Sequence, residues 1–126
     1  MELIYTWADV KGLQDRLIEL RKSICENWDE IQESEKMLAQ MRRQVIPEVG
    51  MPCTTIYYSD RSAAVIKEVR GKKKKEVLVQ ECGTYNGERV FTYRSNGRWV
   101  SKGDSSRGWG CMLGMGYQHN YFDESF

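Results

Sequence analysis

The sequence predicts an α+β fold, in which a long N-terminal helix or a helical hairpin precedes a small antiparallel β-meander sheet. The chain divides near Pro47, because only one of its eleven glycines and neither of its two prolines comes before that residue. Apolar residues before Pro47 recur at helical spacing, and those after it form short β-rich runs between turn signals. The 126 residues suit one domain, with residues 1–46 as a helical oligomerisation part and residues 47–126 as a β-rich ligand-binding part.

The helical part is expected from about Trp7 to Val45, and Thr6 with Asp9 forms a capping-box pattern that begins it. A single helix of this length would reach about 57 Å, too far to bury its apolar stripe on one small sheet. The pattern therefore predicts either a hairpin broken near Ser34 or packing against a second protomer, and self-association is favoured. The apolar positions are Val10, Leu13, Leu17, Leu20, Ile24, Trp28, Ile31, Leu38, Met41 and Val45.

The second part reads as short strands separated by turns. Asn86-Gly87 and Asn96-Gly97 favour tight turns, and Lys72 to Lys75 occupy the tip of another hairpin. Four consecutive lysines at such a tip are typical of a solvated sheet edge that resists aggregation. The expected strands are residues 54–58, 63–69, 76–82, 89–94, 98–102 and 111–117.

Composition excludes several classes of function. Nineteen basic against eighteen acidic residues leave a net charge of +1, which argues against a dedicated binder of duplex nucleic acid. The four cysteines are spaced nearly 28 residues apart and His119 is the single histidine, so we expect free thiols and no metal or cofactor site. The first ten residues form no signal peptide and no run of about 18 apolar residues occurs, so a soluble intracellular protein is expected.

Catalysis is not expected either. Gly110, Gly114 and Gly116 lack the Gly-Lys-Ser/Thr of a phosphate loop, and they suit strand positions where a backbone or a ligand comes close. The carboxylates of Asp104 and Asp123 have no neighbours that would mark an acid and base pair. A metal-dependent nucleotide hydrolase and a structural virion protein remain weaker alternatives.

Arginines among aromatic residues are the strongest sign of a ligand. On a strand, Phe91 and Tyr93 would share one face, while Thr92 and Arg94 would share the other. A nucleotide needs such a combination, because a flat ring stacks the base and guanidinium groups bind phosphate oxygens. The alternative is that these aromatic residues are core and that Arg94 and Arg98 are surface cations.

Three stretches of the chain resemble a known family: YYSDRSAA at residues 57–64, FTYRSNGRWVSKG at residues 91–103 and YFDESF at residues 121–126. They are similar to the first Thoeris anti-defence family, phage proteins that sequester immune signalling nucleotides. The resemblance implies a phage-encoded protein of the host bacterial cytoplasm that assembles as a homo-oligomer, from dimer to hexamer. It would bind glyco-cyclic ADP-ribose, and also cyclic di- and trinucleotides, without cleaving them, and so block Thoeris or CBASS-type effectors.

The same resemblance implies a set of site residues. Arg61 would bind a phosphate, Asn96 would make a polar contact, and Arg107 would make a second anion contact. Arg21 and Thr92 would belong to a second site on a trimer axis. The adenine would stack on one of three aromatic rings, and further contacts would come from flanking residues; these remaining candidates are Ser59, Asp60, Tyr85, Phe91, Tyr93, Arg94 and Trp109.

A nucleic-acid-binding phage accessory module is the main alternative to this sponge. It would use the hairpin of Lys72 to Lys75 to contact phosphate backbones. Its binding would then weaken steeply as salt concentration rises.

Overall fold

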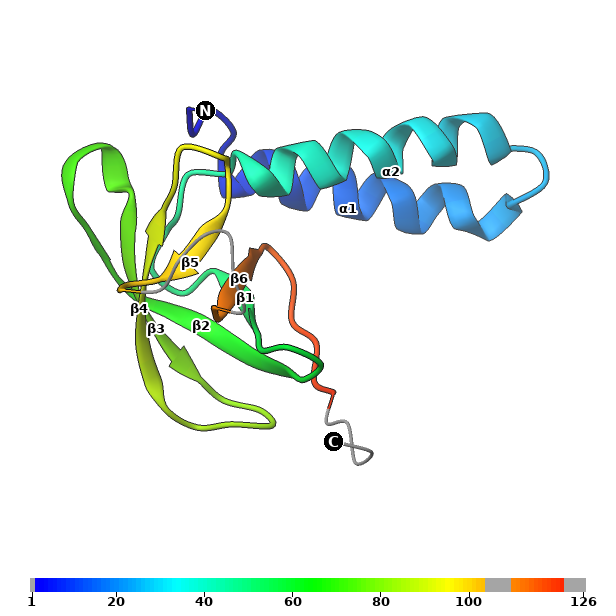
Figure 1. Ribbon diagram of the computed structural model, residues 1–126. Helices are drawn as coiled ribbons and strands as arrows, with labels where there is room; N and C mark the ends of the chain where they lie inside the picture. Colours follow the sequence, from blue (N-terminus) through cyan, green and yellow to red (C-terminus); the bar gives the residue numbers. More distant parts are fainter. Residues whose placement is uncertain (1, 104–109, 122–126) are drawn as a thin grey trace.

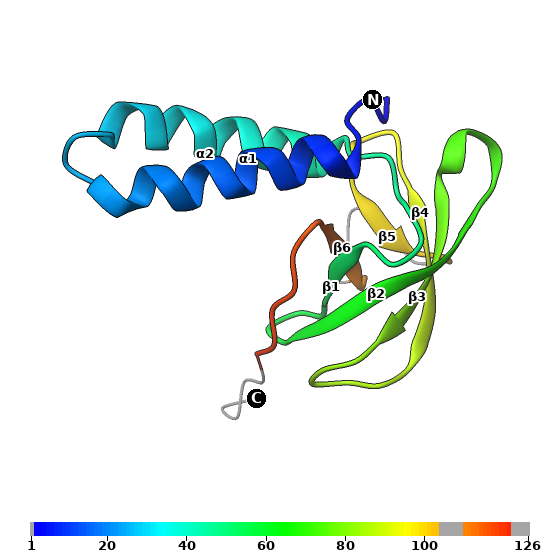
Figure 2. The same ribbon diagram turned by 180° about the vertical axis from the view of Figure 1, so that it is seen from behind.

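The computed structural model describes residues 2–103 and 110–121 of the chain. Two helices, α1 (Trp7–Leu20) and α2 (Trp28–Arg43), run antiparallel and project from one side of a β-barrel (Figures 1 and 2). A single 3-10 turn, η1 (Arg21–Ser23), begins the connection between them. The predicted α+β class, with helices followed by antiparallel strands, is therefore confirmed.

The helical hairpin buries the apolar stripe that the sequence indicates. Thr6 Oγ1 accepts a hydrogen bond from the Asp9 amide at 3.1 Å, and the Asp9 carboxylate accepts one from the Thr6 amide at 3.0 Å, so the capping box forms. At the far end, Asn27 Nδ2 donates to the Leu20 carbonyl at 3.0 Å and satisfies one of the free acceptors at the end of α1. The buried positions are Val10, Leu17 and Leu20 in α1, and Ile31, Leu38 and Met41 in α2.

The predicted break near Ser34 is wrong, and so is one continuous helix. Ser34 lies inside α2, and the chain reverses between residues 21 and 27. Ile24 and Trp28 kept the helical spacing across this reversal, yet they are 51% and 56% exposed. Spacing alone could not separate them from core positions. Because the two helices bury the stripe against each other, this stripe no longer requires a second protomer.

The β-rich part is a six-stranded antiparallel barrel rather than an open sheet. The strands follow one another in chain order, as the predicted meander requires, and β1 also pairs with β6 to close the barrel. The closing pair joins Thr54 to Gly114. The strands are β1 (Pro52–Ile56), β2 (Arg61–Arg70), β3 (Glu76–Glu81), β4 (Glu88–Tyr93), β5 (Trp99–Ser101) and β6 (Met112–Met115).

The barrel interior is filled by side chains that alternate along the strands. Val77 on β3 is opposite Phe91 on β4, and Tyr93 is opposite Trp99 on β5, so these residues share the inner face. All four are buried. The inner face of this small barrel is therefore core and leaves no room for a ligand of nucleotide size.

The two ends of the barrel differ. We call one end the loop end, because it carries the turns at residues 57–60 and 82–87 (Figure 1). The opposite end is called the helix end, because it carries the helices and the turn at residues 94–98. At the helix end, Tyr93 Oη donates to the Arg43 carbonyl at 2.9 Å, and Gln14 Nε2 donates to the Gly116 carbonyl at 2.7 Å. These bonds tie both helices to the barrel.

The lysine turn joins β2 to β3 through the 3-10 turn η2 (Lys72–Lys74). Lys73 and Lys74 have positive φ angles of 57° and 59°, which non-glycine residues rarely adopt. Lys73 and Lys75 lie 4.0 and 3.9 Å from the carboxylate of Glu2. Because β1 and β6 close the barrel, this turn does not protect a sheet edge, and that expectation is corrected.

Candidate functional site

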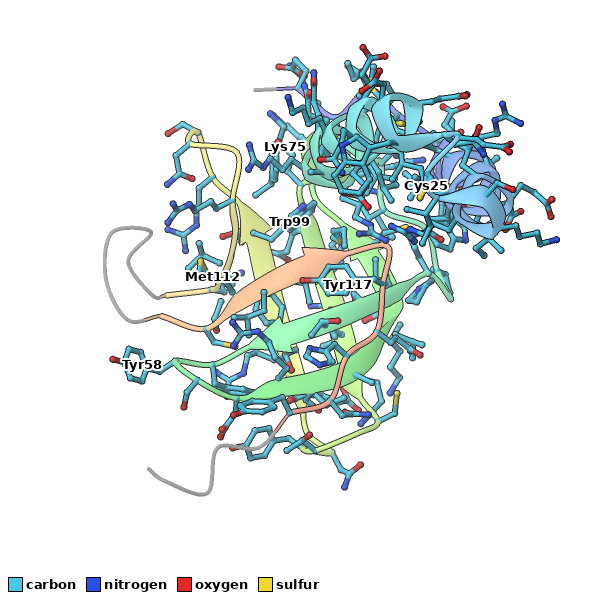
Figure 3. The ribbon with its side chains drawn as sticks, turned by 90° about the vertical axis from the view of Figure 1, so that its right-hand side faces the viewer. Cys25, Tyr58, Lys75, Trp99, Met112 and Tyr117 are labelled. Atoms are coloured by element: carbon cyan, nitrogen blue, oxygen red, sulfur yellow. The ribbon has the colours of Figure 1, made fainter. Side chains whose placement is uncertain are left out.

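A pocket of about 700 Å³ opens at the helix end, between the last turn of α2, the turn at residues 94–98 and the outer face of β6. Figure 3 shows Trp99, Met112 and Tyr117 on this side of the barrel, below the helices. The volume lies within the range of about 300–1,000 Å³ that small-molecule sites occupy. We call it the arginine pocket, after the three arginines in its lining: Arg42, Arg43 and Arg98.

The turn at residues 94–98 places one wall of the arginine pocket. The Arg94 amide donates to the Arg98 carbonyl at 2.8 Å, and the Gly97 amide donates to the Arg94 carbonyl at 2.9 Å. Gly97 has a φ of +80°, a conformation that favours glycine at the end of such a turn. Asn96 Oδ1 accepts a hydrogen bond from the Arg98 amide at 3.1 Å, which fixes the orientation of the Asn96 side chain.

Tyr117 forms the opposite wall, and a glycine makes room for it. A Cβ on Gly114 would overlap the Tyr117 ring, with 2.7 Å to its Cε1 and Cζ atoms, so the ring packs directly on the β6 backbone. The Arg42 guanidinium lies over this ring, 5.0 Å from its centroid, which is a cation–π arrangement. Thr54 Oγ1 donates to the Tyr117 carbonyl at 2.8 Å and holds the segment in place.

Within the described residues, no carboxylate compensates the charge of the arginine pocket. Among the described residues no carboxylate lines it, and none forms an ion pair with Arg42, Arg43 or Arg98. On the helical hairpin, by contrast, Arg16 is paired with Glu30 at 3.0 Å and Arg21 is paired with Glu35 at 2.9 Å. Three arginines without a carboxylate partner among the described residues therefore line one hollow.

Two buried donors next to this hollow also lack partners. In the part of the chain that the structure describes, Arg42 Nε and Trp99 Nε1 are buried and make no hydrogen bond. Desolvation lowers the pKa of the Arg42 guanidinium, which nevertheless stays charged because arginine side chains are not deprotonated in proteins. A buried unpaired donor costs about 1–3 kcal/mol, so an acceptor that reaches either group would stabilise the protein.

A second polar cluster closes the loop end of the barrel. The Glu81 side chain is only 4% exposed, and its carboxylate accepts hydrogen bonds from Tyr57 Oη at 2.9 Å and from Thr55 Oγ1 at 2.8 Å. The Tyr85 ring packs edge-on against Tyr57, 4.8 Å between centroids. Burial and the bond to Glu81 raise the pKa of the Tyr57 phenol.

Four predicted site residues belong to the loop end. Tyr85 Oη donates to the Asp60 carboxylate, and the Arg61 guanidinium donates to the Tyr57 and Asp60 carbonyls at 3.2 and 3.0 Å. Ser59 lies in the same turn. Asp60 and Arg61 thus take part in the closing of this turn. This group lies at the other end of the barrel from Asn96.

The other predicted residues are dispersed. Asn96 lines the arginine pocket, while Arg94 Nε donates to Thr92 Oγ1 at 2.7 Å beside it. Phe91 is fully buried and Tyr93 is 8% exposed, so a base cannot stack on the Phe91 ring and the core interpretation holds there. Arg21 lies at the remote end of the hairpin. Arg107 and Trp109 lie outside the described residues.

The residues that sequence reasoning missed are Arg42, Arg43 and Tyr117. Arg42 and Arg43 resemble ordinary cations of a helix C-terminus, which favour the local dipole. The glycine spacing around Gly114 did indicate a close approach of another group, and that group is the chain's own tyrosine. Over residues 2–103 and 110–121, no three His, Cys, Asp or Glu side chains cluster as metal ligands would.

The four described cysteines are free thiols, with Cys53 and Cys111 buried and Cys25 and Cys82 exposed. None of the described helices combines the length and the apolar character that a membrane crossing requires. Comparison of the chain with family models, with curated proteins and with solved structures finds no match.

Proposed function

We propose that this protein binds a small anionic nucleotide in the arginine pocket and holds it without cleaving it. The observation that carries the proposal is the convergence of Arg42, Arg43 and Arg98, none of them paired with a described carboxylate, on one 700 Å³ hollow. Guanidinium groups bind phosphate oxygens through paired hydrogen bonds, so the phosphates of the ligand fit this wall.

The remaining walls suit the rest of a nucleotide. Met112 and Ile56 give an apolar surface on the outer face of the barrel, and Tyr117 gives an aromatic ring. Asn96 adds an amide on the turn at residues 94–98. Sites for small molecules commonly combine an apolar lining with a few oriented polar groups in this way.

The biological role in this proposal comes from the resemblance to the first Thoeris anti-defence family. The protein would act in the host bacterial cytoplasm as a phage sponge for glyco-cyclic ADP-ribose or for cyclic di- and trinucleotides. Sequestration works by affinity and mass action, so the protein must be as abundant as the signal and release it slowly. Homo-oligomers are expected in this role.

The test is titration calorimetry of the full chain with glyco-cyclic ADP-ribose, cyclic dinucleotides and cyclic trinucleotides. We expect one of these ligands to bind, and heat denaturation should return it intact on chromatography. Arg42→Ala should weaken binding by about tenfold or more, because it removes a charge-assisted contact.

Arg16→Ala is the matched control, since Arg16 lies on α1 and pairs with Glu30. It should bind like the unaltered protein. No binding by any of these ligands, or recovery of a cleaved product, would contradict the proposal.

The lysine turn favours the second candidate, a nucleic-acid module. Lys72, Lys73 and Lys74 are exposed at the tip of the β2–β3 hairpin, and Lys75 is half-buried behind them. This function predicts oligonucleotide binding that weakens steeply with salt. Replacement of all four lysines by alanine would abolish it and would leave binding in the arginine pocket unchanged.

A further inference from the structure

The hydrogen-bonding capacity of the arginine pocket is one-sided. Asn96 Oδ1 already accepts from the Arg98 amide at 3.1 Å, so the Nδ2 group of Asn96 is the part of its amide left to offer hydrogens. Arg98 itself contributes only donors. The wall formed by this turn therefore donates hydrogen bonds.

The other polar side chains of the pocket have the same character. Arg42 and Arg43 contribute donors only, because a guanidinium group has no acceptor. No carboxylate of the described residues lines the pocket. Among the described side chains, the Tyr117 hydroxyl is the strongest acceptor that remains.

Side chains that offer mainly hydrogen-bond donors would discriminate between the two purine bases. The O6 and N7 atoms of guanine both accept, and a guanidinium binds the two together. Adenine has the N6 amine, a donor, in the place of O6. At a wall of donors the amine of adenine would lose its water without gaining an acceptor, whereas the O6 and N7 edge of guanine would satisfy the wall.

We infer that the ligand of the arginine pocket carries a guanine base, read through O6 and N7 by Arg98 with Asn96 Nδ2 beside it. The phosphates of the ligand then bind Arg42 and Arg43 on α2. This inference rests on the proposed nucleotide-binding function and narrows its ligand class to guanine nucleotides. Among the proposed ligands it keeps the cyclic di- and trinucleotides that contain guanine, and it excludes glyco-cyclic ADP-ribose, which carries adenine.

The experiment compares two matched pairs of ligands on the full chain by calorimetry: cyclic di-guanylate against cyclic di-adenylate, and GMP against AMP. We expect the guanine member of each pair to bind about tenfold tighter or more, from one bidentate contact. The 7-deaza analogue of GMP, which lacks N7, should lose most of this preference.

Two variants test which residues distinguish guanine from adenine. Asn96→Asp keeps an oxygen for the Arg98 amide and adds an acceptor, so it should weaken guanine binding and strengthen adenine binding. Arg98→Lys keeps the charge but loses the paired donors, so it should reduce guanine binding alone. Lys102→Ala is the control, because Lys102 pairs with Glu76 at 3.1 Å outside the pocket.

The outcomes separate the two proposals. If adenine ligands bind as tightly as guanine ligands and Arg42→Ala weakens both, the guanine inference is wrong and the nucleotide-binding function stands. If Asn96→Asp leaves the ratio of guanine to adenine affinity unchanged, the assignment of base recognition to Arg98 and Asn96 is wrong. If no nucleotide binds, both proposals fail.

Discussion

The Arg42 guanidinium lies over the ring of Tyr117, with 5.0 Å between its Cζ and the ring centroid. The ring in turn rests on the backbone of Gly114. Helix α2 and strand β6 therefore meet through a stack of three residues that forms one wall of the arginine pocket. The stack holds a long, flexible side chain in position, which reduces the entropy that ligand binding would otherwise cost.

Gly114→Ala tests this stack. The added methyl group would displace Tyr117, so we expect a loss of about 1–3 kcal/mol in the free energy of unfolding, as overpacking causes. Nucleotide affinity should fall as well, because Arg42 loses its support. Gly12→Ala is the control, since nothing lies within 4 Å of a Cβ at this position. Its free energy of unfolding should rise by up to about 1 kcal/mol, because alanine favours the helical conformation more than glycine does. Chemical unfolding and calorimetry measure both effects.

Tyr57→Phe should destabilise the barrel by about 1.5–3 kcal/mol, because a buried carboxylate loses a hydroxyl donor. The carboxylate is that of Glu81, which is only 4% exposed. Tyr121→Phe is the matched control, since Tyr121 is 51% exposed and pairs with Arg61 through its backbone. Equal unfolding midpoints in urea for the two variants would contradict the role assigned to Tyr57.

The same phenol predicts a loss of stability in alkali. The pKa of Tyr57 is raised in the folded state above its ordinary value of 10.0. The stability it contributes is therefore complete below pH 10 and declines as the pH rises further, because only the unfolded chain releases the proton there. Tyr57→Phe should flatten this decline in unfolding experiments between pH 9 and about pH 11.

The capping box of α1 predicts that stability also falls at low pH. Hydrogen bonds from Thr6 lower the pKa of the Asp9 carboxyl below its ordinary value of 3.8. Its contribution is present above pH 3.8 and is lost as the pH falls through the lowered pKa of the folded state. Asp9→Asn should be less stable at neutral pH and should show a weaker acid dependence. An identical pH profile for Asp9→Asn and the unaltered chain would contradict this.

Self-association remains a prediction, and it now concerns other residues than the buried stripe. Ile18, Ile24 and Trp28 are 58%, 51% and 56% exposed toward the remote end of the helical hairpin. Covering such side chains in an oligomer would stabilise the assembly. Light scattering should therefore show a mass above that of one chain, and Trp28→Ser should lower it. A monomer at every concentration would contradict the prediction.

Local chemistry made much of the fold predictable. The Asn96-Gly97 pair indicated its turn, and the alternation of Val77 and Val79 indicated β3, because each signal depends on neighbours in sequence. The reversal at residues 21–27 was not predictable from spacing, since Ile24 and Trp28 continue the helical period while exposed. Closure of the barrel was missed for a similar reason: Thr54 and Gly114 pair across sixty positions, and no local pattern marks such a partner.

The candidate site was harder to predict than the fold. The aromatic residues Phe91 and Tyr93 had the right types for a nucleotide, but strand alternation directs them into the core. Asn96 was a site candidate through the family resemblance, and it lines the arginine pocket. Arg42 and Asn96 line the same pocket, although they lie far apart in the chain. The hydrogen bond from Tyr93 Oη to the Arg43 carbonyl, between residues fifty positions apart, helps to hold the end of α2 against the barrel.

The pairing of β1 with β6 also determines the order in which this molecule can be completed. The pairs β1–β2, β2–β3 and β3–β4 join neighbours in the chain, so they form early, whereas the pairing of β1 with β6 waits until residues 112–115 have been synthesised. Until then β1 and β5 present two open edges, which are templates for pairing with other chains. A chain cut before Met112 would therefore aggregate even though it keeps the helical hairpin and five of its strands.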